Sequence, residues 1–95
     1  MPPVTRLGDV CTGHDCFNPR PSISASPNVN ANGIPVVRVG DNYALHGCSN
    51  RKPHTGILVS GSSTVSVNGL PVGRVGDGIS CNSSVAAGSP DVIIG

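Results

Sequence analysis

The stretch Pro35-Val36-Val37-Arg38-Val39-Gly40-Asp41 occurs three times in this chain of 95 residues, with small changes. Residues 3–9 read Pro-Val-Thr-Arg-Leu-Gly-Asp, and residues 71–77 read Pro-Val-Gly-Arg-Val-Gly-Asp. The shared phrase is Pro-Val-x-Arg-x-Gly-Asp. Self-similarity at a spacing of a few tens of residues is typical of a chain built from structural repeats. The sequence therefore predicts three equivalent units.

A second phrase alternates with the first and leads, in each unit, from small residues to a valine. Its copies are residues 23–29, 58–65 and 86–92. In the first two units it continues through Asn32-Gly33 or Asn68-Gly69 into the next Pro-Val phrase, whereas the third unit reaches Gly95 where its turn would begin. The chain thus opens with the second half of a unit and closes with the first half. We expect its two ends to pair in space, which would complete a closed, pseudo-three-fold body.

The local signals favour short strands and hairpins. Asn-Gly between alternating residues is a strong hairpin signal, because both turn positions need a positive φ. The proline two residues after each Asn-Gly removes a ladder donor, which restricts these strands to edges or to pairing on one side. No window shows helical spacing of apolar residues, and Gly or Pro interrupts nearly every stretch of ten. We expect one all-β domain over residues 1–95.

The composition suits a stapled scaffold better than one with a large core. There are 13 Gly and 9 Pro, and Tyr43 and Phe17 are the only aromatic residues. Small scaffolds with a thin core commonly need disulfides, a metal or a partner. The net charge of +1 gives no electrostatic case for nucleic-acid binding. The apolar runs are far shorter than the roughly 20 residues that a membrane helix requires.

The four cysteines are better explained as thiols or metal ligands than as two disulfides. The first residues lack the apolar core of a secretory signal, so we expect assembly in the reducing cytoplasm. Metal-ligand residue types follow each Gly-Asp at matched places: His14 comes five residues after Asp9, and His46 five after Asp41. Cys81 comes four residues after the third aspartate.

Equivalent positions in a pseudo-three-fold body converge on its axis, so these three side chains are predicted to meet at one end. The connection that follows Asp41 is the longest of the three and contains His54, a fourth donor. Three imidazoles and one thiolate form a plausible tetrahedral zinc set, and four protein ligands leave no open position. The predicted site is therefore structural: His14, His46, His54 and Cys81 around one zinc ion. Cys11, Cys16 and Cys48 remain alternatives, either as substitutes for a histidine or in a disulfide.

An enzymatic reading is disfavoured. The Arg and Asp of the repeated phrase occur in three equivalent copies, whereas an active site needs one constellation, so we expect these residues to brace turns. A Cys81 nucleophile activated by a histidine is the sharper enzyme hypothesis. No oxyanion-hole or pocket signature accompanies it.

These repeated phrases, with Val-Asn-Gly-x-Pro before one of them and a His or Cys after each Asp, resemble the PAAR-repeat proteins over essentially the whole chain. The eponymous tetrapeptide reads Pro-Val-Thr-Arg, Pro-Val-Val-Arg and Pro-Val-Gly-Arg here, with Val, Thr or Gly where alanines are named. The resemblance implies a small cone that caps a trimeric β-helical spike and is closed at its apex by zinc. The four proposed ligands match the zinc site of that family.

The resemblance also implies a function and partners. The expected function is a structural tip that sharpens the spike of a type VI secretion system or phage-like contractile tail for membrane piercing. The expected partner is a trimeric spike protein, VgrG-like or a phage spike, held through the base of the cone, and the free tip would be a monomer. An adaptor that attaches effector proteins to the spike is the alternative. The machine would deliver the tip from the cytoplasm toward the target cell.

Overall fold

The computed structural model describes residues 2–13, 19–48, 51–80 and 82–95. Within these ranges it contains short strands, bridges and turns and no helix, which confirms the all-β prediction. The strands are β1 Asn30–Ala31, β2 Ile34–Pro35, β3 His46–Cys48, β4 Arg51–His54, β5 Ser66–Val67, β6 Leu70–Pro71, β7 Gly78–Ile79 and β8 Ser83–Ser84.

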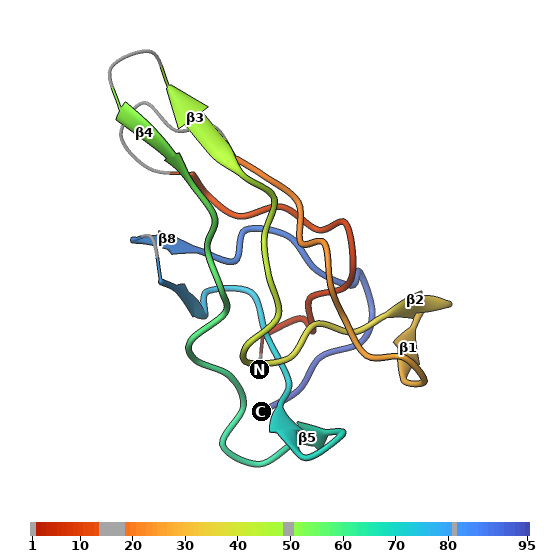
Figure 1. Cartoon of the computed structure of the whole chain (residues 1–95). Helices are drawn as coiled ribbons and strands as arrows, with labels where there is room; N and C mark the ends of the chain where they lie inside the picture. Colours follow the sequence, from red (N-terminus) through yellow and green to blue (C-terminus); the bar gives the residue numbers. More distant parts are fainter. Residues whose placement is uncertain (1, 14–18, 49–50, 81) are drawn as a thin grey trace.

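Each strand pairs antiparallel with its neighbour in sequence, which gives four two-stranded sheets: β1-β2, β3-β4, β5-β6 and β7-β8. The molecule is elongated, with extents of 39 × 23 × 22 Å. The β3-β4 hairpin lies at one end of the long direction (Figure 1). The β1-β2 and β5-β6 hairpins lie in the other half, with both chain termini (Figure 1). We call this second end the base.

The two Asn-Gly pairs form the predicted hairpin turns. Asn32 and Gly33 have φ values of 56° and 75°, and Asn68 and Gly69 have 55° and 78°. Positive φ at both central positions is the signature of a type I′ turn, which matches the twist of the flanking strands. These turns set the register of β1-β2 and β5-β6, in which Ala31 pairs with Ile34 and Val67 with Leu70.

Backbone hydrogen bonds join the three Pro-Val-x-Arg phrases to one another. The amide of Thr5 donates to the carbonyl of Gly73 at 3.1 Å, Gly73 donates to Val37 at 2.8 Å, and Val37 donates to Thr5 at 3.1 Å. These bonds close a cycle, which we call the amide ring. It ties residues from the beginning, middle and last third of the chain together.

The two ends of the chain pair with each other, as predicted. Pro3 forms an antiparallel bridge with Ile93, and the amide of Ile94 donates to the carbonyl of Pro2 at 3.0 Å. The amide of Val4 donates to Val92 at 2.9 Å. The first and last segments therefore form one strand pair on the base side of the amide ring.

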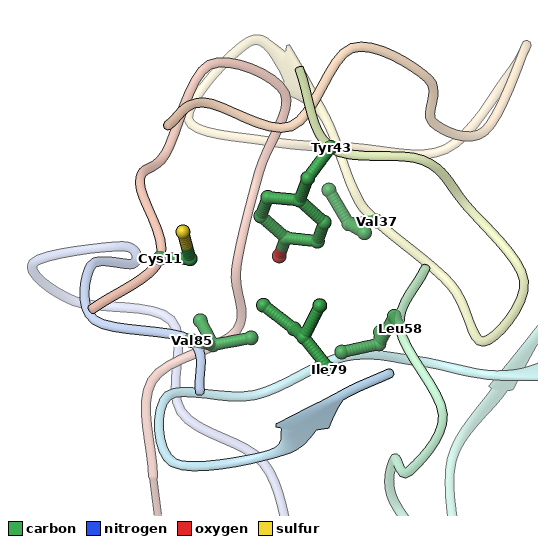
Figure 2. Packing of buried hydrophobic residues seen from close by; sticks show 6 residues of the cluster. All are labelled: Cys11, Val37, Tyr43, Leu58, Ile79 and Val85. Atoms are coloured by element: carbon green, nitrogen blue, oxygen red, sulfur yellow. The ribbon is translucent and has the colours of Figure 1, made fainter. Parts of the chain in front are cut away.

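The larger of the two cores centres on an aromatic ring. Tyr43 is fully buried among five smaller side chains (Figure 2): Cys11, Val37, Leu58, Ile79 and Val85. Its hydroxyl has no hydrogen-bond partner among the described residues. Burial raises the pKa of Tyr43 well above its ordinary value, so this phenol stays neutral. A second core of Val4, Ala31, Val36, Val67 and Val72 lies toward the base.

Candidate metal site and base

The Arg and Asp of each repeated phrase clamp a turn. The backbone amide of Arg38 donates to Asp41 Oδ2 at 2.8 Å, and its Nε donates to the same oxygen at 3.0 Å. Its Nη2 donates to Asp41 Oδ1 and to the carbonyl of Ala25. The pairs Arg6–Asp9 and Arg74–Asp77 make the same backbone-amide and Nε contacts. The contacts are those of the predicted turn-bracing role.

The charge on Asp41 is stabilised by its partners. Burial alone raises the pKa of Asp41, but hydrogen bonds from the side chain and backbone of Arg38 and from Ser24 outweigh it. The pKa of this carboxyl therefore lies below its ordinary value of 3.8. Because the ion pair is largely shielded from water, removing one partner leaves a poorly solvated, unpaired charge and costs more than breaking an exposed pair would.

Acid is expected to weaken the fold through this clamp. A carboxyl with a lowered pKa contributes stability above its unfolded-state pKa, and that contribution disappears as the pH falls through its folded-state pKa. The free energy of unfolding should thus decline below about pH 4. Asp41→Asn should cost about 1–3 kcal/mol at neutral pH and flatten the acid limb, as measured by urea unfolding at several pH values. Parallel pH profiles for the two proteins would contradict this assignment.

Two of the four predicted metal ligands occupy partner positions in the backbone. His46 in β3 and His54 in β4 lie opposite each other in the antiparallel register, which shifts between His46 and Cys48. The α-carbons of such partners are about 4.5–5.5 Å apart. The β3-β4 hairpin, at the end opposite the base (Figure 1), therefore brings together two backbone positions that are eight residues apart in the sequence.

The remaining two predicted ligands, His14 and Cys81, lie outside the described residues, as does Cys16. In the described part of the chain no group of three or more His, Cys, Asp or Glu side chains gathers. The four-ligand set therefore stays a prediction. Cys11 is buried in the Tyr43 core, where its sulfur accepts a hydrogen bond from the amide of Arg20 at 3.3 Å. This environment fits packing better than metal ligation.

An apolar hollow of about 150 Å³ opens at the base. Three repeat positions line it, each in three copies: Val4, Val36 and Val72; Val29, Val65 and Val92; Ala31, Val67 and Ile94. Asn30 completes the lining, which contains no charged residue. The repeat pattern of the sequence does not by itself indicate this hollow. The apolar residues before each turn indicate a buried face at this end of the molecule. Their alternation with polar residues does not show that the three segments leave a space between them.

The third repeated phrase lies in a segment that matches a known protein family. The family model for the PAAR motif matches residues 49–95, about half of the chain. Residues 49–95 of this chain carry the PAAR motif. The matched segment contains the third repeated phrase, His54 and Cys81. The first two phrases of this PAAR-motif chain lie before the match and make the same clamps as the third.

No curated protein matches the PAAR-motif chain. Its described residues include no helix that is long and apolar enough to cross a membrane. The family is one of structural spike tips rather than of enzymes, and its members associate with the spikes of contractile injection systems.

Proposed function

We propose that this chain is the pointed tip of a contractile injection machine and caps a trimeric β-helical spike. The PAAR motif carries the proposal. The amide ring supports it, because three like phrases bond in a cycle, as we would expect of a single chain with pseudo-three-fold character. A monomer with three similar faces can meet three identical subunits at once. The tip would cover the end of the trimer and sharpen it for membrane piercing.

The base is the proposed docking face. Its hollow is apolar and repeats the same three positions around its wall, which suits contact with the end of a three-fold partner. Capping also protects strand ends of the trimer that would otherwise remain open to pairing. We place the tip in the cytoplasm during assembly and with the machine on delivery.

We further propose that His14, His46, His54 and Cys81 hold one structural zinc ion at the opposite end. The opposed positions of His46 and His54 fit this donor set. Zinc takes three imidazoles and a thiolate in tetrahedral coordination, and no ligand position is left for catalysis. When bound, the ion would supply a crosslink between loops that have little core of their own.

Docking through the base can be tested with two matched substitutions. Val29 lines the hollow and is 38% exposed, whereas Val59 is 52% exposed and does not line it. Val29→Asp should place a charge in the apolar contact and reduce capture of trimeric β-helical spike proteins from the same genome at least tenfold, since a buried unpaired charge costs several kcal/mol. Val59→Asp should leave capture unchanged. Binding would be measured by co-purification and biolayer interferometry.

Equal capture by both variants would show that the base is not the docking face. Capture of an effector protein by the wild-type chain, with no binding to any trimeric spike, would instead favour the adaptor function. Both variants should melt close to the wild-type temperature, because both valines are partly exposed.

A further inference from the structure

At two places in the molecule, which we call corners, an asparagine side chain bridges an arginine and a serine. Asn32 Oδ1 accepts hydrogen bonds from Arg6 Nη1, at 3.2 Å, and from the hydroxyl of Ser89. Asn68 Oδ1 does the same for Arg38 Nη1, at 3.2 Å, and for the hydroxyl of Ser26, at 2.6 Å. In each corner a carboxamide oxygen from one unit joins an arginine and a serine of other units.

The third corner has the same donors without the carboxamide. Arg74 is bound to Asp77 and donates to the carbonyl of Gly61, just as the other two arginines bind their own partners. Among the described residues, however, Arg74 Nη1 has no hydrogen-bond acceptor. The hydroxyl oxygen of Ser62 accepts hydrogen bonds from the amides of Thr64, at 3.1 Å, and Val65, at 2.9 Å, and lies 3.3 Å from Thr64 Oγ1, but no carboxamide oxygen accepts from it. The Arg74 side chain is 22% exposed, against 14% and 15% for the other two. We call this place the open corner.

Gly95 occupies, in the third unit, the position from which Asn32 and Asn68 supply the carboxamide in the other two corners. Gly95 follows Val92-Ile93-Ile94 as Asn68 follows Val65-Ser66-Val67. A Cβ atom on Gly95 would lie 3.2 Å from Thr64 Oγ1. In the occupied corner, Asn68 Nδ2 donates to Asn28, which corresponds to Thr64, at 2.8 Å. A side chain at position 95 would therefore point at the same partners that Asn68 reaches.

We propose that the open corner, formed by Arg74, Ser62 and Thr64, is a binding site for the carboxamide of an Asn or Gln side chain. The two occupied corners show which chemistry satisfies these donors. A carboxylate suits the corner less well, because the charge of Arg74 is already balanced by Asp77 at 2.8 Å. The corner adjoins Val65 in the wall of the base hollow, so the docked spike is the expected source, and this assignment of the source rests on the proposed function.

A carboxamide tethered within the chain tests the site itself. Gly95→Asn should raise the melting temperature by roughly 3–8 °C relative to Gly95→Ala, because its carboxamide oxygen would accept hydrogen bonds from Arg74 and Ser62. The gain should vanish in a Ser62→Ala background. Asn68→Gly, which empties an occupied corner and keeps the positive φ of its turn, should lower the melting temperature by a similar amount. If Gly95→Asn melts no higher than Gly95→Ala, the proposal is wrong.

The source of the carboxamide is tested by spike capture. If the spike supplies it, Gly95→Asn should weaken capture about three- to tenfold, because the tethered group already fills the corner, and Gly95→Ala should not. Unchanged capture, together with the stabilisation, would support the same carboxamide site but assign its natural donor to a segment joined after Gly95. If the wild-type chain captures no spike, the proposed function fails, while the thermal comparison still decides the site.

Discussion

Replacing any of the four proposed ligands by alanine is expected to remove the metal and lower the melting temperature together. The variants are His14→Ala, His46→Ala, His54→Ala and Cys81→Ala. Apparent binding energies of structural zinc sites are on the order of 10 kcal/mol or more, which is comparable to the whole stability of a small domain. Among the described residues, β3 and β4 form a two-stranded sheet with no third strand, so a crosslink there should matter more than core packing. Elemental analysis and thermal unfolding would measure the two effects.

Two controls make the metal experiment decisive. Treating the wild-type protein with a chelator should reproduce the melting temperature of the ligand variants and should not change theirs further. Thr55→Ala, at an exposed position next to His54, should keep both the metal and the stability. Protein purified without chelator that contains no metal would overturn the site assignment.

Removing the aromatic ring at position 43 is the second large effect. Tyr43→Ala should cost about 3–5 kcal/mol, since it leaves a cavity where the side chains of the larger core meet. For a domain of this size that lowers the melting temperature by well over 10 °C. Tyr43→Phe should be neutral or slightly stabilising, because the buried hydroxyl that it deletes has no partner among the described residues. Urea unfolding of the three proteins checks both expectations.

A milder substitution at an equivalent position provides the scale. Ile79 occupies in the third unit the place that Tyr43 has in the second, and Ile79→Val should cost only about 0.5–1.5 kcal/mol. A Tyr43→Phe variant that is strongly destabilised would show that the buried hydroxyl makes a hydrogen bond, either to bound water or to the side chain of Thr5. A Tyr43→Ala variant with near wild-type stability would mean that the ring is not central to the core.

Much of the fold could be predicted from the repeated phrases, because their signals are local. Asn-Gly sets a type I′ turn through φ, and Arg and Asp three residues apart clamp their own turn wherever the phrase occurs. The pairing of the chain ends followed from the phase of the repeat. None of these predictions required knowledge of how distant side chains share space.

The unequal contents of the core could not be predicted in this way. Equivalent positions hold Cys11, Tyr43 and Ile79, and the large ring in one unit is offset by small groups in the others. Gly73 shows the same compensation, because a Cβ there would lie 2.5 Å from Leu58 Cδ2. A repeat pattern treats its copies as equal, whereas packing divides one volume among them. The zinc set and the open corner likewise depend on which copy differs.

The amide ring has a consequence for synthesis. Its three members come from residues 5, 37 and 73, so no nascent segment shorter than about three quarters of the chain contains all of them. Contacts between such distant residues form late and slowly, because the intervening loops must close first. A fragment that ends before Gly73 therefore lacks two of the three hydrogen bonds of the amide ring and cannot fold as a smaller version of the whole.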